Sequence, residues 1–326
     1  MAETPNYMAA INAALTDAME ADDRVVLLGI DVAAPGGVYG VTKGLYDRFG
    51  QSRVRDTPIA EAGVMGAAVG AAMAGLRPVV EVMYMDFITV CLDPLVNQAA
   101  KLRYMTGGRV DIPVVFRMQT GGGRSAGAQH SQSLEGLLAH IPGLKVFCPS
   151  DARDAYDLLR EAIDDDSPVC FVENRRLYPR SDPEGWAREP LSAGSPRVVR
   201  PGDDMTVVTW GRMVTETLKA VDTLAGAGRD VEVIDLRTLV PLDLTVVLES
   251  VRKTGRCLIV HEAVERFGPG GELAARVVQE ALFEIDGPIE RFGALACPVP
   301  YSPNLEAEVL PGRERIAQRL ESFADA

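Results

Sequence analysis

The sequence contains few histidines and cysteines, which argues against several kinds of site. Only three of its 326 residues are histidine, and they lie far apart at positions 130, 140 and 261. The segment "HEAVE" at residues 261–265 lacks the second histidine of the HExxH zinc motif, so we do not expect a histidine-built metal centre. The five cysteines include no CxxC pair, which favours reduced thiols in a cytoplasmic protein over a disulfide framework.

The chain also lacks the signals of a secreted, membrane or nucleic-acid-binding protein. Its first residues, "MAETPNYMAA", include neither a basic region nor an apolar stretch, so no secretory signal is expected. The longest uncharged run of small and apolar residues, 62–76, is shorter than the roughly 18–20 residues that span a bilayer. A formal net charge of -13 would repel phosphate backbones and anionic lipids. We therefore expect neither nucleic acid nor membrane as a partner.

What the chain does contain is a globular composition and an alternation of helix and strand patterns. It is 47% hydrophobic and 24% charged, and its length exceeds that of most single cores, so two domains are expected. Buried-strand patterns alternate with amphipathic helices in both halves, which indicates parallel sheets covered on both faces. We predict the class α/β with two doubly wound domains, at residues 1–185 and 204–326, joined by a Pro-, Gly- and charge-rich linker at 186–203.

One carboxylate has unusual neighbours. The segment "DTPIAEAGVMGAAVGAAMAGL", residues 56–76, places Glu61 at the head of a helical run of small and apolar side chains. The simplest interpretation is a first-turn carboxylate that interacts with the helix dipole, worth under about 1 kcal/mol. Because Ile59, Ala60 and Ala62 offer no polar partner, the alternative is a glutamate that exchanges a proton with a bound heterocycle.

The same run carries a stripe of very small residues. Gly66, Gly70 and Ala74 are spaced four apart, so they lie on one face of the helix. Such a face permits close backbone packing, and the run is too short for a membrane helix. The stripe indicates a tight helix contact, either in the core or at a subunit interface.

A glycine-rich loop carries the first histidine. The segment "TGGGRSAGAQHSQS", residues 120–133, follows a predicted strand and places His130 near its far end. It is either a surface loop with a solvated histidine or a loop that delivers His130 to the carboxyl edge of a parallel sheet, where ligands of α/β proteins bind. The other glycine cluster, "FGPGGELA" at 267–274, has Leu273 where a dinucleotide motif needs glycine, so we interpret it as a turn that opens a helix.

These motifs together resemble the β subunit of the thiamine-diphosphate-dependent decarboxylating component of 2-oxo acid dehydrogenases, of the pyruvate, branched-chain and acetoin types. The similarity extends over essentially the whole chain. It rests on residues 56–87, on "DPLVNQAAKLRYMTGG", "RSAGAQHSQSLE", "HIPGLKV", "AIDDDSPV" and "VEVIDLRTLVPLD". The segments "MDFI" and "VNQAAKLRYM" slightly favour the acetoin type. The resemblance implies a transketolase-like pyrimidine-binding domain followed by a transketolase C-terminal-type domain, and an oxidoreductase.

The resemblance also implies roles for particular residues. Glu61 matches the glutamate that hydrogen-bonds the aminopyrimidine of thiamine diphosphate and so activates the cofactor, while Ile59, Met83 and Phe87 match residues around the pyrimidine. His130 matches the histidine that assists decarboxylation or acyl transfer to the lipoyl group. The family also implies a structural potassium ion, bound by backbone carbonyls at Val114, Ala162, Ile163, Asp165 and Ser167.

One absence points to a second subunit. Thiamine diphosphate enzymes hold magnesium and the diphosphate with a GDG motif followed by Asn, and no GDG occurs in this chain. The resemblance therefore implies half an active site, completed by an α subunit that holds the diphosphate and Mg²⁺. It implies a heterotetramer of two α and two β chains that passes the acyl group to a lipoyl-bearing acyltransferase or another carrier.

One position departs from the family. After the first strand the family has an acidic residue, as in "GEDV", whereas this chain reads "LLGIDVA" with Ile30 in that place. Isoleucine neither relays a proton nor accepts a hydrogen bond. This departure keeps open a split transketolase-like enzyme that transfers a two-carbon ketol or acyl unit to another acceptor. A non-catalytic partner subunit is a third alternative, against which the retention of Glu61 and His130 argues.

Overall fold

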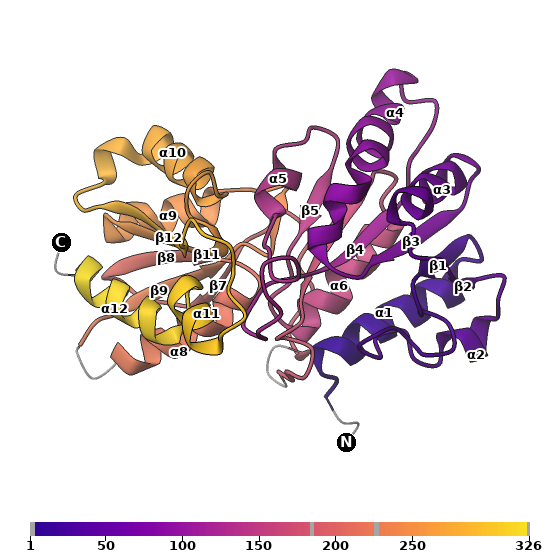
Figure 1. The fold of residues 1–326 in the computed structure, drawn as a ribbon. Coiled ribbons are helices and arrows are strands. Elements are labelled where there is room, and N and C mark those ends of the chain that lie inside the picture. Colours follow the sequence, from indigo (N-terminus) through magenta and orange to yellow (C-terminus); the bar gives the residue numbers. More distant parts are fainter. Residues whose placement is uncertain (1–3, 183–185, 225–227, 325–326) are drawn as a thin grey trace. The chain divides into compact units, whose positions relative to one another are not determined.

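The computed structural model describes residues 4–182, 186–224 and 228–324, which group into two compact units (Figure 1). The first unit comprises residues 1–120 and 137–193, and the second comprises residues 121–136 and 194–326. The glycine-rich loop thus belongs by its contacts to the second unit, although it lies within the first half of the sequence. No helix in the described ranges is long and apolar enough to cross a membrane.

The first unit is built on a parallel sheet. Within this unit the strand order is β5-β6-β4-β3-β1-β2, and every neighbouring pair is parallel. The strands are β1 (Val25–Gly29), β2 (Val54–Asp56), β3 (Arg77–Val82), β4 (Val115–Thr120), β5 (Lys145–Phe147) and β6 (Val169–Asn174). Their residues are almost all buried, as expected for a sheet covered on both faces.

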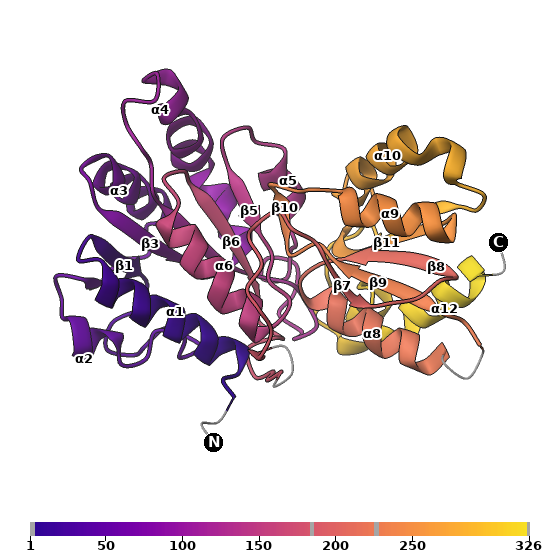
Figure 2. The same ribbon diagram turned by 180° about the vertical axis from the view of Figure 1, so that it is seen from behind.

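Helices cover both faces of this sheet, as Figures 1 and 2 show from opposite sides. One face carries α3 (Glu61–Met73), η1 (Met85–Cys91), the π-helical η2 (Asp93–Ala99) and α4 (Ala100–Met105), and the other carries α1 (Tyr7–Ala21) and α6 (Ala152–Asp164). Two short helices, α2 (Leu45–Phe49) and α5 (Glu135–Ala139), complete the series. In α1 the buried residues Ile11, Leu15 and Met19 recur every four positions and form its core-facing stripe.

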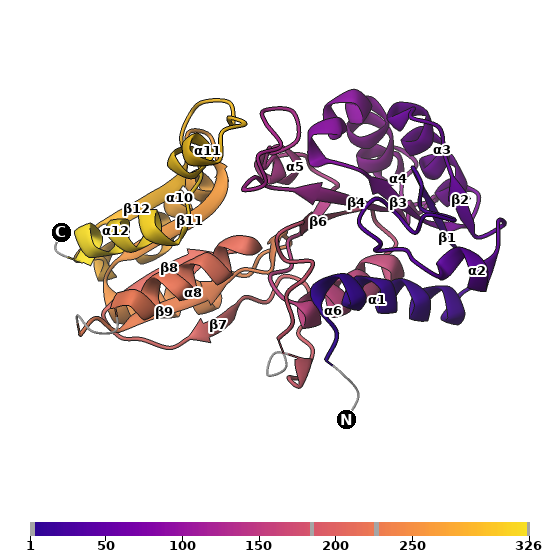
Figure 3. The same cartoon turned by 60° about the horizontal axis from the view of Figure 1, so that its bottom comes forward.

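The second unit repeats this plan with a smaller sheet (Figure 3). The strand order is β12-β11-β8-β9-β7, parallel except for the antiparallel edge strand β7. The strands are β7 (Arg197–Arg200), β8 (Met205–Thr209), β9 (Val231–Asp235), β11 (Cys257–Val264) and β12 (Ile289–Ala294). The short strand β10 (Thr238–Val240) is not part of this five-stranded sheet. The helices are α8 (Arg212–Leu224), α9 (Thr245–Thr254), α10 (Gly270–Ala281), η4 (Leu282–Glu284), α11 (Pro303–Val309) and α12 (Arg313–Ala324).

Two doubly wound α/β domains are therefore confirmed as the fold class. The segment predicted as a linker, residues 186–203, nevertheless includes β7, which pairs with β9 through Val198 and Ile234. The sequence did not reveal this edge strand because β7 is short, has an arginine at each end and is only partly buried.

Candidate active site

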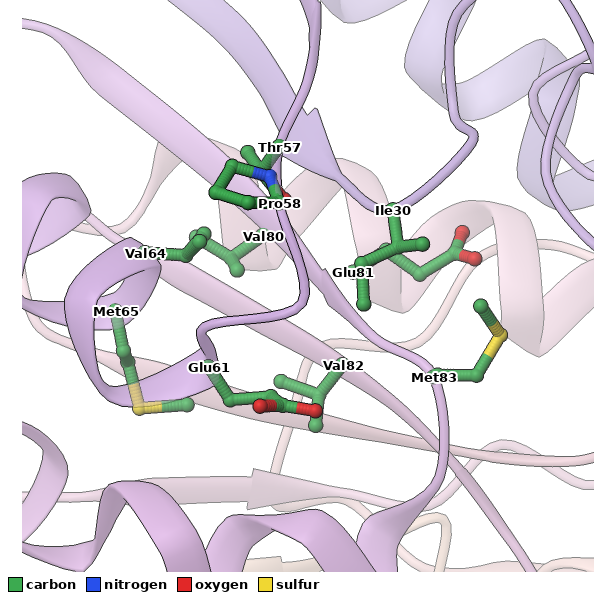
Figure 4. Close-up of a pocket in the computed structure, with 10 residues that line it drawn as sticks. All are labelled: Ile30, Thr57, Pro58, Glu61, Val64, Met65, Val80, Glu81, Val82 and Met83. Carbon is green, nitrogen blue, oxygen red and sulfur yellow. The ribbon is translucent and has the colours of Figure 1, made fainter.

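A small pocket lies at the carboxyl ends of β1 and β3, next to the first turn of α3 (Figure 4). Apart from two carboxylates and one threonine its lining is apolar. It is lined by Ile30, Thr57, Pro58, Glu61, Val64, Met65, Val80, Glu81, Val82 and Met83. This is the edge of a parallel sheet at which ligands of α/β proteins bind, so the sheet topology itself places the pocket.

Glu61 begins α3 and lines this pocket. Ala60 occupies the cap position and supplies no side-chain hydrogen bond, so Glu61 is the only acidic group of the first helical turn. The Glu61 side chain is half-buried. Within the part of the chain that the structure describes, no hydrogen bond or ion pair to its carboxylate is made. The carboxylate is therefore available to a ligand, and the helix N-terminus favours its negative charge.

Ile30 lies beside a second carboxylate. The parallel register of β1 and β3 pairs Gly29 with Glu81, and Ile30 follows directly after this pair, so both Ile30 and Glu81 line the pocket (Figure 4). A Cβ at Gly29 would meet Val32 Cγ1 at 2.7 Å and Glu81 Cβ at 3.0 Å, so glycine suits this close approach of the two strands. The pocket therefore has an acidic group, Glu81, next to Ile30.

Glu81 belongs to a buried ion cluster in the middle of the sheet. The Arg117 guanidinium donates to Glu81 Oε2 at 3.0 Å and to both carboxylate oxygens of Glu173, at 2.6 and 3.0 Å. Tyr178 Oη donates to Glu173 Oε2 at 2.8 Å. Burial raises the pKa of Glu81, against the lowering effect of Arg117. Each carboxylate of the cluster thus accepts a hydrogen bond from Arg117, as buried charged groups require a partner.

The other residues assigned to the pyrimidine by resemblance lie around this pocket in different ways. Met83 lines it. Phe87 lies one turn further on, in η1, and packs edge-on against Tyr84 with ring centroids 5.6 Å apart. Ile59 is 80% exposed and, like Phe87, is not part of the pocket lining. Their contact with a ligand stays a prediction.

His130 lies on the glycine-rich loop of the second unit and is half-buried. Its main-chain N–H donates to the Gly127 carbonyl at 3.3 Å. Tight turns need left-handed backbone angles at Gly123 and Gly127, with φ of 84° and 75°. At Gly127 a side chain would also collide with the Tyr301 ring. The glycines that the sequence placed here are thus required by the loop's course.

A second buried group of polar residues lies close to this loop. The Trp210 indole stacks on His261 with ring centroids 5.4 Å apart, and its Nε1 donates to Glu135 Oε1 at 3.3 Å. Burial lowers the pKa of His261 to about 4, so its imidazole is neutral at pH 7. Burial raises the pKa of Glu135 to about 7, against the lowering effects of its backbone hydrogen bond and of Trp210.

The predicted turn before α10 packs against this histidine. A side chain at Gly268 or Gly270 would come within 2.9 Å of the His261 ring. The turn in "FGPGGELA" and the helix after it are therefore confirmed, with Pro269 at the cap position.

The carbonyls assigned to potassium lie in one part of the first unit. Ala162 and Ile163 lie in the last turn of α6, Asp165 and Ser167 follow that helix, and Val114 directly precedes β4. Carbonyl oxygens at a helix C-terminus are donors suited to a monovalent cation. The Arg77 guanidinium donates to the Ile163 and Asp165 carbonyls at 2.9 and 3.1 Å, and each keeps a second lone pair. No group of three potential acidic, cysteine or histidine metal ligands occurs among the described residues.

The small-residue face of α3 has no close neighbour at its two glycines among the residues that the structure describes. A Cβ added at Gly66 or Gly70 would meet no atom within 4 Å, and both glycines are exposed. Of the two alternatives left by the sequence, a contact in the core is thus wrong. The neighbouring Ile59 and Met73 are also exposed, at 80% and 46%.

Family comparisons bear directly on this arrangement. Residues 3–181 match the family described as "Transketolase, pyrimidine binding domain", and residues 194–316 match "Transketolase, C-terminal domain". The chain belongs to the transketolase-like family. The fold agrees, since the split-gene transketolase described as an inactive beta4 tetramer has a TM-score of 0.79 at 20% identity, covering 99% of both chains.

Closer relatives in sequence are beta subunits of dehydrogenases. The chain is 45% identical to the beta subunit of acetoin:2,6-dichlorophenolindophenol oxidoreductase from Cupriavidus necator, covering 97% of this chain and 96% of the relative. It is 43% identical to the mitochondrial pyruvate dehydrogenase E1 component subunit beta-1 from Arabidopsis thaliana, covering 95% and 86%. The resemblance to 2-oxo acid and acetoin dehydrogenase beta subunits is confirmed, and the split transketolase alternative is not favoured.

Sequence reasoning missed several residues of this region. Glu81 and Arg117 read as ordinary strand residues, and the spacing around them contains no motif. Glu135 was missed as well, because its partner Trp210 lies 75 residues away along the chain. The one available signal was a charged residue inside an otherwise apolar strand, which requires a buried partner.

Proposed function

We propose that this chain is the β half of a thiamine-diphosphate-dependent dehydrogenase that decarboxylates a 2-oxo acid or cleaves acetoin. The observation that carries the proposal is the Glu61 carboxylate, which lines an apolar pocket at the sheet edge without a hydrogen-bonding partner among the described residues. The 45% identity to an acetoin oxidoreductase beta subunit supports the same reaction class.

The pocket residues suit one part of the cofactor. Because Glu81 is paired with Arg117, the apolar lining leaves the Glu61 carboxylate to accept a hydrogen bond from a flat ring with a protonated nitrogen. When bound, thiamine diphosphate supplies the nucleophilic carbon and the electron sink. Glu61 would hold a proton between its carboxylate and the ring nitrogen, and Met83 would pack against the ring, with Ile59 and Phe87 nearby. His130 would assist decarboxylation or acyl transfer.

The other part of the cofactor needs a second subunit. The sequence has no GDG motif and the described residues include no acidic metal cluster, so we assign Mg²⁺ and the diphosphate to an α subunit. The exposed glycine face of α3 supports a partner here, because glycines let a second backbone approach closely. An α₂β₂ heterotetramer that transfers the acyl group to a lipoyl-bearing acyltransferase or another carrier is part of this proposal.

Potassium has a structural role in the proposal. The five carbonyls near the end of α6 supply the donor type, and the ion would share two of them with the Arg77 guanidinium.

The experiment is reconstitution. The chain is co-expressed with a candidate α subunit, purified, and titrated with thiamine diphosphate and Mg²⁺ by calorimetry, beside each subunit alone. The complex, and neither subunit alone, is expected to bind the cofactor and to reduce a dye acceptor with acetoin or one of a series of 2-oxo acids. Cofactor binding without turnover of any of these substrates would contradict the reaction class. Failure of every α–β complex to bind the cofactor would overturn the proposal.

A further inference from the structure

The loop that carries His130 is attached to the second unit by glutamate side chains. Gly122 N–H donates to Glu262 Oε1 at 2.8 Å. Gly123 and Ser125 N–H donate to the two oxygens of Glu306, at 2.7 and 2.9 Å. Glu262 lies on β11 and Glu306 on α11, respectively 140 and 183 residues from the loop amides that they bind.

The Glu306 contact has the geometry of an anion-binding turn. Gly123 and Ser125 both have positive φ, 84° and 54°, which turns their N–H groups toward one acceptor. Ser125 is not glycine, so its left-handed backbone is strained and needs support from surrounding structure. Both oxygens of Glu306 take one main-chain N–H each, and a charged acceptor makes such bonds stronger than a neutral one.

This attachment is buried and closely packed. Glu306 and Glu262 are only 3% and 7% exposed. A side chain at Gly122 would come within 2.4 Å of Leu310 Cδ1 and 3.2 Å of Glu306 Oε1. The Arg212 guanidinium lies 3.5 Å from Glu262 Oε1 and balances its charge. The far end of the loop is held separately, because Trp210 donates to Glu135.

We propose that Glu306 and Glu262 are positioning residues that set the conformation of this loop and so the place of His130 in the reaction. This inference rests on the role of His130 in the proposed function. Through these two glutamates the C-terminal domain would affect the rate of the reaction without touching substrate or cofactor. Neither glutamate takes part in bond making.

The main variant is Glu306→Gln, with Glu308→Gln on the exposed side of the same helix as the matched control. Glutamine keeps the shape of glutamate but offers one acceptor oxygen, so one loop N–H faces an NH₂ donor instead. In the α–β complex, kcat should fall roughly 10- to 100-fold, because small misplacements of a reacting group have large effects on rate. The Kd for thiamine diphosphate should stay within about twofold of wild type, and Glu308→Gln should behave as wild type.

Two further measurements separate positioning from general damage. Hydrogen exchange of the peptide containing residues 121–126 should be faster in Glu306→Gln and unchanged in Glu308→Gln. In a His130→Ala background, Glu306→Gln should cause no further loss of kcat, since it acts through that histidine. If Glu306→Gln does not fold, Glu306→Asp, which keeps the charge but shortens the reach, is measured in the same way.

Unchanged exchange of the loop, unchanged kcat, or an equal loss of kcat with and without His130 would each overturn the inference. A failure of the proposed function looks different. The wild-type complex would then show no turnover, or His130→Ala would be fully active, while the exchange result for Glu306→Gln would still report on the attachment of the loop.

Discussion

Glu61 and Glu306 are both glutamates in the first turn of a helix, yet the structure uses them in opposite ways. Glu61 is half-buried at a pocket, and none of the described residues donates a hydrogen bond to it. Glu306 is buried, and both of its oxygens accept main-chain N–H groups. A carboxylate whose acceptor capacity is left open is available to a ligand, whereas one that is fully used by the main chain determines conformation.

The Arg117 cluster adds a third use of carboxylates. Glu81 and Glu173 are buried against one guanidinium in the middle of a sheet, and Glu81 also lines the pocket of Glu61. Burial alone would lower the pKa of Arg117, but the two glutamates raise it overall. Four substitutions test these assignments and the role of the glycine face of α3, and they follow in order from the largest expected effect to the smallest.

Glu61→Gln should remove activity without affecting folding. Loss of a proton-exchanging group lowers turnover by about 10²–10⁴-fold, while stability should hardly change because the described structure gives Glu61 no partner to lose. Steady-state assays of the α–β complex and thermal melts of the chain measure both. Glu249→Gln, on the exposed face of α9, is the control. Near-normal turnover in Glu61→Gln would show that the Glu61 carboxylate does not act on the cofactor.

Arg117→Met, in contrast to Glu61→Gln, should act mainly on the stability of the fold. Removing one partner of a buried ion pair destabilises a protein by roughly 3–5 kcal/mol, because it leaves the other charges unpaired. Urea unfolding of the chain measures this loss. The matched control is Arg24→Met, which removes only the exposed pair with Asp22 and should leave the midpoint unchanged. An equal change in the unfolding midpoint of both variants would show that the Arg117 cluster does not stabilise the fold.

Glu135→Gln should change how stability depends on pH. The folded pKa of about 7 lies above the ordinary 4.5, so the stabilisation from protonated Glu135 is complete below about pH 4.5 and lost as the pH rises through 7. Glutamine keeps the acceptor for Trp210 and has no charge to bury. At pH 8 the variant should therefore be more stable than wild type by about 3 kcal/mol.

Urea unfolding at pH 5, 6, 7 and 8 tests this expectation. The advantage of Glu135→Gln should grow with pH and vanish near pH 5. Glu272→Gln, at an exposed position of α10, should show no such trend. An advantage that does not vary with pH would mean that burial of the Glu135 charge is not its source.

Gly66→Leu should have the smallest effect on the chain and a specific effect on assembly. Its Cβ would enter open space, and leucine is a better helix former than glycine by up to about 1 kcal/mol, so the melting temperature should hold or rise. Association with the α subunit should weaken, since a large side chain keeps a close-packed backbone away. Ser322→Leu on the exposed face of α12 is the control, and co-purification yields measure the difference.

Sequence reasoning recovered most of the fold because hydrophobic periodicity is a local property. Buried strands alternate with helices in both units, as the apolar spacing of the two halves predicted, and α3 forms from the run that begins at Glu61. The edge strand β7 was missed because it is short and only partly buried, so its residues show no apolar pattern.

For the candidate site, the sequence by itself determined which residues stand out: Glu61 heads a run of small residues, Ile30 follows a buried strand, and the glycines permit the loop of His130. Only the tertiary structure decided how carboxylates are used. It brought Glu306 to Gly123 across 183 residues, and it placed Arg117 between Glu81 and Glu173. The physical reason is that a carboxylate's role depends on which donors surround it, and those donors come from segments whose proximity no local pattern encodes.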